Sequence, residues 1–406
     1  MRKAGGADHR RDRSGARGIS LPTGRFPMPY WRLSSFYFFY FAALGVLIPF
    51  WGLYLKDLGF TPLVIGELMA ILMATKIIAP NLWGWIADRT DARLPLVRLG
   101  SLLSLLAFFG MFAVNGFWGI ALVMTLFSFF WHASLPQVEV VTFNHLGTRT
   151  RRYATIRLWG SISFILTVLA LGAVVERTGT DIIPKLILVF YAGIWLSSLA
   201  IPDPRRPSMG QPSGSLAGLV KRPEIIAFLA ACFLMQASHG AFYTFYSIYL
   251  TEAGYSGALV GALWAWGVVL EVLVFWRMHR LLERFGARRI LLTSLGLAVV
   301  RWLLTGGFVD NPAIQLFAQT LHAATFAAFH AAAIHLVHHY FRGHTQGRGQ
   351  ALYSSLSFGA GGAVGSLLSG MLWSGAGAGF VFILSAPAAG LGWLAVWGWV
   401  DKERRF

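Results

Sequence analysis

Twelve long apolar stretches run through the chain, each close to the roughly 20 residues that a helix needs to span a lipid bilayer. Hydrophobic residues make up 56% of the sequence and charged residues only 13%, whereas about a quarter of a soluble domain is charged. We therefore predict an all-α membrane protein with twelve transmembrane helices. The predicted helices cover residues 33–55, 62–83, 95–114, 117–143, 154–175, 184–201, 224–250, 257–277, 289–309, 312–338, 350–373 and 379–400.

The positive charges fall on one side of this layout. If residue 1 lies in the cytoplasm, the cytoplasmic segments hold 28 of the 34 lysines and arginines, the outer loops hold three, and three lie within helices. Positive residues accumulate on the cytoplasmic side of membrane proteins. We therefore predict a protein of the cytoplasmic (inner) membrane with both termini in the cytoplasm. The net charge of +17 then follows from topology, and we expect no nucleic-acid partner.

A sequence repeat with an offset of 195 residues divides the chain. The stretch from Gly84 to Arg93 returns, less well kept, from His279 to Arg288, with an acid, an arginine, an alanine and an arginine in register. The same offset relates two pairs of glycines, Gly45 with Gly240 and Gly66 with Gly261. Two parallel halves in a membrane favour a secondary transporter that alternates access to a central site by rocking its halves.

One long connector separates the predicted halves, which are residues 28–201 and residues 223–406. The connector at 202–222 carries four prolines with glycine and serine between them, which is typical of a linker. Residues 1–27 are rich in arginine and glycine, so we expect a disordered basic tail. The one cysteine, Cys232, lies in an apolar run and is expected to be a small core residue.

Several motifs resemble those of the major facilitator superfamily. The Gly-x-x-x-Asp-Arg-x-x-x-Arg pattern from Gly84 to Arg93 is similar to the signature loop between helices 2 and 3 of that superfamily. The aromatic run from Phe36 to Phe41, with Pro49-Phe50-Trp51, resembles the branch of lactose permease and the nucleoside symporters. The stretches Arg157 to Ser161 and Gly349 to Tyr353 look like phenylpropionate-permease-like members of that branch. The resemblance implies the major facilitator fold, with two pseudo-symmetric six-helix halves.

The same resemblance implies a gating role for the charged motif, which would hold one state of the transport cycle through salt-linked contacts. Asp91 departs from the pattern, because a glycine is usual there, and Glu283 replaces the aspartate in the second copy. The implied gating residues are Gly84, Asp88, Arg89, Arg93, Glu283 and Arg284.

Charged residues within the predicted helices are functional candidates, because an ionisable group in lipid is costly. Glu139 and Arg157 flank a short loop, so two antiparallel helices would bring them level. Lactose permease binds its substrate with a glutamate and an arginine at a similar spacing, and the resemblance implies this role for Glu139 and Arg157. Arg157 would hold a carboxylate or hydroxyl through its planar guanidinium. Polar and aromatic residues expected to face the same cavity are Tyr40, Gln236 and His239.

A second group of polar residues suits proton coupling, since imidazole titrates near neutral pH. The helix at 312–338 carries a polar stripe made of Gln315, Gln319, His322 and His330. By resemblance to lactose permease, Glu271, Arg301 and His322 would couple transport to protons, with His330 nearby. That permease also has a glutamate just after its histidine, whereas residues 323–329 contain no acid here.

Two further charges, Glu67 and Lys76, are nine residues apart and point to opposite sides of the helix at 62–83, so they cannot pair with each other. Lys76 would reach the cavity as a group that attracts anions. Glu67 lies closer to the outer face.

We predict a proton-coupled symporter for a small organic compound. An aromatic carboxylate such as phenylpropionate is favoured, and a sugar or nucleoside stays open. The alternative is a proton antiporter that exports drugs or metabolites, although residues 154–175 lack the Pro-Gly-rich motif of such antiporters. A membrane-embedded enzyme or sensor is disfavoured, because the sequence has no phosphate loop and no His or Cys cluster with metal spacing. We expect no cofactor or metal, and a monomer whose partners are its substrate, protons and the bilayer.

Overall fold

We describe the protein from a computed structural model, which defines residues 28–203, 216 and 218–400. Within these residues every regular element is a helix, and twelve helical segments are long and apolar enough to cross a membrane. This result confirms the predicted fold class. The predicted basic tail at 1–27, most of the linker at 202–222 and the last six residues lie outside the described part of the chain.

The first half contains six membrane-spanning segments. They are α1 (Tyr30–Asp57), α2 (Pro62–Thr90), α3 (Arg93–Phe109) with the 3₁₀ turn η1 (Gly110–Phe112), α4 (Gly116–Leu146), α5 (Tyr153–Thr178) preceded by η2 (Thr150–Arg152), and α6 (Ile182–Ala200). Several helices are longer than predicted; α2, for example, continues to Thr90 instead of ending at residue 83. An apolar stretch marks where lipid surrounds a helix, and the helix itself extends past the bilayer.

The second half repeats this arrangement with more interruptions. Its segments are α7 (Pro223–Ser238) with α8 (Gly240–Glu252), α9 (Gly257–Phe285), α10 (Ala287–Gly307), α11 (Pro312–His322) with η3 (Ala323–Ala328) and α12 (Phe329–Tyr340), η4 (Gly343–Thr345), α13 (Gln346–Ser354) with η5 (Ser355–Gly361) and α14 (Gly362–Ala376), and α15 (Ala378–Trp399). The bounds of α2 and α9 differ by 195 residues at both ends, so the sequence repeat is also a structural repeat.

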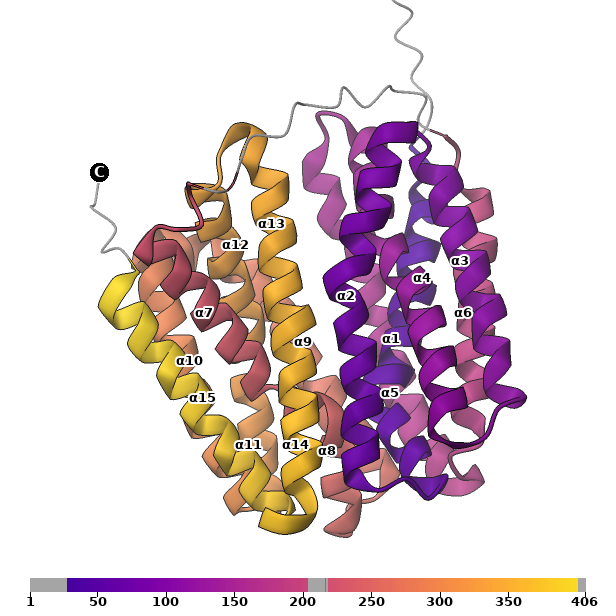
Figure 1. Cartoon of the computed structure of the whole chain (residues 1–406), viewed down its shortest axis with the longest axis vertical. Coiled ribbons are helices and arrows are strands. Elements are labelled where there is room, and N and C mark those ends of the chain that lie inside the picture. Colours follow the sequence, from indigo (N-terminus) through magenta and orange to yellow (C-terminus); the bar gives the residue numbers. More distant parts are fainter. Residues whose placement is uncertain (1–27, 204–215, 217, 401–406) are drawn as a thin grey trace, which may run out of the picture.

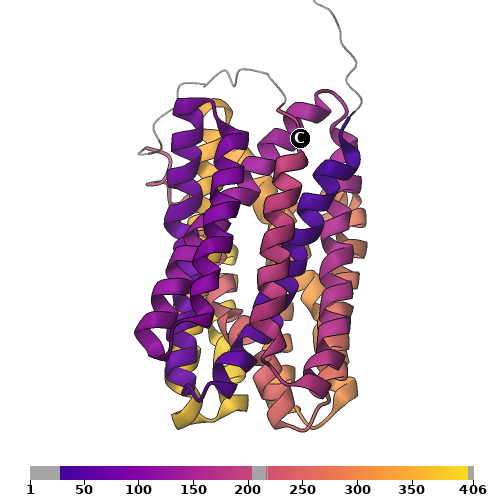
Figure 2. The ribbon, with the colours of Figure 1, turned by 90° about the vertical axis from the view of Figure 1, so that its right-hand side faces the viewer.

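The two halves stand side by side, and the axes of their helices lie roughly along the long direction of the bundle (Figure 1 and Figure 2). The end of the bundle at which α2 ends and α3 begins carries many positive residues, which include Arg89, Arg93, Arg98, Arg149, Arg151 and Arg152. The opposite end, at which α1 and α5 end and α6 begins, carries Lys56, Arg177 and Lys185. We call these ends the arginine-rich side and the arginine-poor side.

The outer surface of the bundle is apolar and its interior holds polar residues, as expected for a protein surrounded by lipid. Large apolar side chains are exposed on the outside, for example Trp118 at 83% and Trp276 at 73%. A soluble protein rarely exposes so much apolar surface. Polar residues gather inside, and Cys232 is fully buried, as expected for a small core residue. The chain is an integral membrane protein.

Backbone contacts between glycines join the halves near the arginine-poor side. A Cβ atom on Gly172 of α5 would lie 2.2 Å from the carbonyl oxygen of Gly257 in α9, and one on Gly261 would lie 2.2 Å from the carbonyl oxygen of Val168. A Cβ atom on Gly66 of α2 would lie 2.8 Å from Cα of Gly370 in α14. Only glycine permits approaches this close. We call these contacts the α5–α9 seam and the α2–α14 seam.

Polar contacts reinforce the closure on this side. The ammonium of Lys56, at the end of α1, lies 2.8 Å from the carboxylate of Glu252, at the end of α8. Oε2 of Glu176 in α5 accepts a hydrogen bond of 3.2 Å from the backbone N–H of Ala258, in the first turn of α9. Both contacts cross from one half to the other. The halves are therefore joined at the arginine-poor side by apolar seams and by charged groups.

Two stretches of π-helix interrupt the second half, at η3 (Ala323–Ala328) and η5 (Ser355–Gly361). A π-turn holds one more residue than an α-turn and is frequent at functional sites. The first stretch follows His322 directly. The second faces α2, where a Cβ atom on Gly359 would lie 2.6 Å from Cγ1 of Ile77. The irregular turns therefore lie beside the interior polar residues described next.

Candidate functional site

A buried hydrogen-bonded pair in the second half joins Glu271 of α9 to His322 at the end of α11. Oε1 of Glu271 lies 2.7 Å from Nε2 of His322, and the two side chains are only 12% and 6% exposed. A contact of this length needs one proton between the oxygen and the nitrogen. The pair can therefore exist with one or two protons, which differ by one unit of charge inside the membrane. The structure brings these two predicted coupling residues into direct contact.

Arg301 of α10 lies beside this pair without forming an ion pair with Glu271. Its Nη2 donates a hydrogen bond of 3.1 Å to Oε1 of Gln319, which lies one turn before His322. Its Nη1 lies 3.3 Å from Nε2 of His239, at the break between α7 and α8. The guanidinium also covers the ring of Phe242 at 4.3 Å, and this ring lies 5.2 Å from that of His322. Arg301 is thus connected to the pair through its neighbours.

Some polar atoms of this cluster are buried and make no hydrogen bond to any residue that the structure describes. They are Nε of Arg301, Nε2 of Gln319 and Nδ1 of His322. Buried polar atoms in proteins almost always have a partner. The cluster therefore offers hydrogen-bonding groups to a further molecule, which fits a site that exchanges protons or ligands.

His330 lies in different surroundings from the other coupling candidates. Its Nδ1 is 2.9 Å from the hydroxyl of Tyr353 in α13. The ring of Phe326 stacks between the two histidines, 5.5 Å from His322 and 6.3 Å from His330. An apolar ring therefore separates His330 from the Glu271–His322 pair, and the structure shows no direct hydrogen bond between them.

The predicted substrate-binding pair of the first half does not form a direct ion pair. Oε1 of Glu139 accepts a hydrogen bond of 2.9 Å from the hydroxyl of Tyr153. The guanidinium of Arg157 lies over the ring of Phe41 at 3.7 Å and near that of Tyr37 at 5.9 Å. Aromatic faces attract a guanidinium, and a phenol gives the carboxylate its hydrogen bond, so each charge has a neutral neighbour. The two charges remain close enough to act on each other.

The remaining three substrate-site candidates have separate surroundings. Tyr40 stacks on Trp131 at 4.9 Å within the first half. Gln236 is buried in α7 beside Gly361 of η5, where a Cβ atom on that glycine would lie 3.2 Å from Cβ of Gln236. His239 belongs to the Arg301 cluster of the second half. The structure therefore does not show these three side chains lining one cavity.

A sequence model described as the MFS_1 like family matches residues 30–384. The chain belongs to this family. It is an integral membrane transporter of the major facilitator superfamily, as the motifs predicted, and its relatives are transporters and not enzymes.

Two similar sequences are transporters of different compounds. The chain is 32% identical over 361 residues to a "Probable 3-phenylpropionic acid transporter" of Escherichia coli (strain K12), covering 87% of this chain and 93% of that protein. It is 30% identical over 279 residues to a "Maltose permease" of Geobacillus stearothermophilus, covering 66% of this chain and 68% of that one. Among solved structures, the D323A mutant of the nucleoside transporter NupG has a TM-score of 0.81 at 17% identity, over 92% of this chain and 100% of that chain.

The signature motif of this MFS transporter lies mostly on a helix. Asp88 and Arg89 belong to the last turns of α2, which ends at Thr90, so the loop before α3 is reduced to Asp91 and Ala92. Asp91 has φ 51° and ψ 24°, and it is the one non-glycine residue with positive φ among the described residues. This left-handed conformation explains why a glycine is usual at this position.

The two copies of the motif make different contacts. In the first copy, Arg93 forms an ion pair with Asp88, and its Nη1 donates a hydrogen bond of 2.7 Å to Oε1 of Gln137 in α4. Gly84 also faces Gln137, whose Nε2 would lie 3.6 Å from an added Cβ, and Arg89 covers the ring of Trp85 at 4.1 Å.

In the second copy, Glu283 lies 3.2 Å from Nε2 of His279 one turn earlier on the same helix. Arg284 lies 5.3 Å from the ring of Phe285. These contacts stay within the end of α9. Arg288 of α10, the counterpart of Arg93, instead donates hydrogen bonds of 2.8 Å to the backbone oxygens of Trp397 and Val400 at the end of α15. The first copy thus joins its acid and Arg93 to α4, whereas the second copy joins only its last arginine to another helix, so the two copies are not structurally equivalent.

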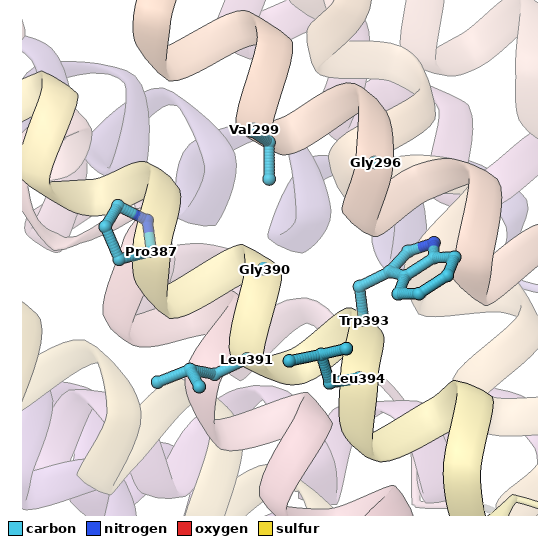
Figure 3. A pocket seen from close by; sticks show the side chains of 7 residues that line it. All are labelled: Gly296, Val299, Pro387, Gly390, Leu391, Trp393 and Leu394. Carbon is cyan, nitrogen blue, oxygen red and sulfur yellow. The ribbon is translucent and has the colours of Figure 1, made fainter.

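An apolar hollow lies elsewhere, on the outer surface between α10 and α15 (Figure 3). Its lining includes Gly296 and Val299 from α10 and Pro387 and Trp393 from α15. It contains none of the predicted site residues. Its apolar lining suits lipid chains, so it is not a candidate for the transport site. In the described part of the chain, no group of three or more His, Cys, Asp or Glu residues is placed to hold a metal ion.

Sequence reasoning missed two parts of the interior. Tyr153, the partner of Glu139, gave no signal because it lies at the predicted start of a helix. A polar cluster on α2 and α4 was also missed. His132 lies within an apolar stretch, which is the same signal that pointed to the other intramembrane candidates. The cluster contains Thr75, Ser128 and His132, with Thr75 Oγ1 lying 2.9 Å from both partners.

Proposed function

We propose that this MFS transporter is a proton-coupled symporter for a small organic substrate, working by rocking of its two halves. The observation that carries the proposal is the buried contact of 2.7 Å between Glu271 and His322. An imidazole titrates near neutral pH, and carboxyl and imidazole groups together form the proton relays of pumps and transporters. A buried pair of this kind inside a transporter supports coupling, because binding a proton changes its charge where charge is costly.

Neighbouring residues support this assignment. Arg301 places a fixed positive charge beside the pair through Gln319 and His239. When the pair binds its second proton, the cluster gains a net positive charge, which favours either proton loss or the approach of an anion. We include His330 as an outer member, because its ring continues the stack through Phe326.

We propose an aromatic carboxylate as the substrate, with 3-phenylpropionate as the first compound to test. Support comes from the 32% identity to a transporter named for that acid. The guanidinium of Arg157, which lies over the ring of Phe41, and the buried ring of Tyr40 suit such a compound. Glu139, Gln236 and His239 are further proposed contacts. The similarity to a maltose permease makes a sugar the second compound to test.

We also propose the orientation of the protein. The arginine-rich side would face the cytoplasm in a cytoplasmic membrane, in keeping with the distribution of positive residues. The contacts between halves at the arginine-poor side would then close the site from the outside. We propose that the transporter works as a monomer, with Asp88, Arg93 and their neighbours stabilising the opposite closed state.

Uptake into proteoliposomes tests this function. Labelled 3-phenylpropionate should accumulate when an inward proton gradient is imposed, with protein-free liposomes as the correction for passive entry of the protonated acid. Glu271→Gln should lose this accumulation but keep exchange of labelled for unlabelled substrate, because exchange needs binding and rocking but no net proton movement. Accumulation driven only by an outward proton gradient would favour the antiporter. Equal accumulation by Glu271→Gln and the wild type would show that this pair does not couple transport.

A further inference from the structure

The repeat places opposite charges at one equivalent position of the two halves. Lys76 of α2 and Glu271 of α9 are 195 residues apart, and α2 and α9 begin and end with the same offset. Glu271 contacts a histidine of the neighbouring polar helix. Thr75, which precedes Lys76, also contacts a histidine, since its Oγ1 lies 2.9 Å from Nδ1 of His132 in α4. The first half thus has a cation and a histidine where the second has an acid and a histidine.

The faces of α2 show where Lys76 points. Ile78, Leu82 and Trp85 are exposed on the lipid side, at 61%, 41% and 52%. Thr75 faces α4, and Ile77 faces η5 of the other half. Successive residues of a helix are about 100° apart, so Lys76 points between the direction of Thr75 and that of Ile77. This direction is opposite to the lipid side. Lys76 therefore points into the interior, between α4 of the first half and the η5–α14 segment of the second.

Lys76 has no carboxylate partner in the part of the chain that the structure describes. Its Nζ contacts Sδ of Met73 at 3.4 Å, and a thioether is a weak hydrogen-bond acceptor. None of the ion pairs among the described residues includes Lys76. An ammonium inside a membrane is costly and normally pairs with an anion. The chain therefore holds, in its interior, a cation that a bound anion would satisfy.

His132 supplies the second polar group. It is 5% exposed, and its Nε2 makes no hydrogen bond within the described residues. Its Nδ1 contacts Thr75, whose hydroxyl is also 2.9 Å from Ser128. Thr75 has one hydroxyl proton, and the backbone oxygen of Leu72 at 3.0 Å is a second acceptor for it. In the tautomer in which Thr75 donates to Nδ1, the imidazole carries its proton on Nε2, which becomes a donor. Lys76 directly follows Thr75, the residue of α2 that contacts this ring.

Aromatic surface adjoins these polar groups. The ring of Trp131 lies 5.0 Å from that of His132 and 4.9 Å from that of Tyr40. Nε1 of Trp131 also has no hydrogen-bond partner in the part of the chain that the structure describes. A compound with a carboxylate and an apolar ring would satisfy the ammonium and lie next to aromatic faces. A neutral sugar would leave the ammonium without a counter-charge.

We propose that Lys76, assisted by His132, binds the carboxylate of an organic acid in the first half, while the Glu271–His322 pair in the second half handles protons. This inference rests on the proposed function and deepens it, since it assigns the carboxylate to Lys76 and makes an acidic group a requirement for binding. The two members of one repeated position would then serve the two co-transported species, with the cation for the anionic substrate and the carboxyl for the proton.

Equilibrium binding to the full-length protein in lipid nanodiscs tests the inference. The probes are 3-phenylpropionate, benzoate and hexanoate, each compared with its own primary amide. The wild type should bind each acid that it recognises more tightly than the corresponding amide. Lys76→Met should weaken acid binding by roughly 10- to 100-fold, as expected for a lost charged hydrogen bond. Lys76→Arg should keep part of the preference. Lys185→Met removes an exposed lysine on the arginine-poor side and should change nothing.

The thermal stability of each variant separates lost binding from lost folding. Lys76→Met should melt no lower than the wild type, because it removes an interior charge without a protein counter-charge. If Lys76→Met keeps the full preference for acids, or if the wild type binds no acid better than its amide, the inference is wrong. Proton-driven uptake is measured separately. Acid binding that depends on Lys76 without coupled uptake would overturn the proposed symport alone, and coupled uptake by Lys76→Met would overturn the inference alone.

Discussion

The ammonium of Lys56 and the carboxylate of Glu252 lie 2.8 Å apart and join the two halves where α1 and α8 end. At the repeat offset of 195 residues, Glu252 corresponds to Asp57, the neighbour of Lys56. The bridge therefore connects nearly equivalent positions across the pseudo-twofold relation. Both side chains are about 40% exposed, at 40% and 41%, so water screens the pair and its contribution to stability is small.

Breaking this bridge should shift the balance of states only modestly. Lys56→Ala should raise the population that is open at the arginine-poor side by less than about fivefold, since an exposed pair contributes at most about 1 kcal/mol. Spin labels at Asp181 and Asp310, one on each half, would report the change as longer distances in a Cys232→Ala background. The charge exchange Lys56→Glu with Glu252→Lys should restore the original distances. Unchanged distances in Lys56→Ala would show that this bridge does not help to hold the arginine-poor side closed.

The seams should be far less tolerant than the bridge. Gly172→Ala places a Cβ 2.2 Å from a backbone oxygen of α9, so the closed state should lose about 1–3 kcal/mol through overpacking. Substrate exchange in proteoliposomes should fall accordingly, and the spin-label distances should lengthen. Gly375→Ala is the control, because an added Cβ there meets nothing within 4 Å. Equal exchange by the two variants would contradict a role for the α5–α9 seam in closure.

The two copies of the repeated motif should differ in importance. Asp88→Asn weakens the ion pair with Arg93, which also holds Gln137 of α4. We expect a clear loss of transport rate from this change. Glu283→Gln removes only an exposed contact within α9, so its rate should stay near that of the wild type. Initial uptake rates at matched protein amounts measure both, and a larger loss in Glu283→Gln would reverse this assignment.

Asp91 provides a test of backbone strain. A β-branched residue is disfavoured at its φ of 51°, so Asp91→Val should be less stable than Asp91→Gly by roughly 1–2 kcal/mol. Comparing the two variants with each other cancels the loss of the aspartate side chain. Thermal unfolding in detergent, followed by tryptophan fluorescence, would give the difference in melting temperature. Equal melting temperatures would show that the α2–α3 turn adapts to either residue.

The number and order of the helices could be predicted because lipid demands about 20 apolar residues per crossing. The helix ends could not, since polar residues continue a helix outside the bilayer, as α2 does up to Thr90. The π-turns at Ala323–Ala328 and Ser355–Gly361 also gave no signal. Small residues in these stretches fit either kind of helix, and only the neighbouring helices decide between them.

Sequence reasoning came closest at the contact between Glu271 and His322, because the resemblance to lactose permease already grouped these two residues with Arg301. Glu271 and His322 meet because both lie in apolar stretches of adjacent helices and each needs a partner. Glu139 and Arg157 looked equally suited to pair, but Tyr153 and Phe41 offered a phenol and an aromatic face nearer at hand. Residue spacing gives the level of a side chain in the membrane. It does not show which neutral neighbours compete for it.

The glycine seams have a mechanical consequence. Where the halves meet as backbone against backbone, no long side chains interlock across the joint, so the surfaces can separate and return without any side chain changing its rotamer. Each atomic contact in such a joint is weak, and the hold comes from their number. Such a joint is stable when fully closed and loses most of its contacts at a small separation of the two helices. This behaviour suits a carrier that must open and close many times.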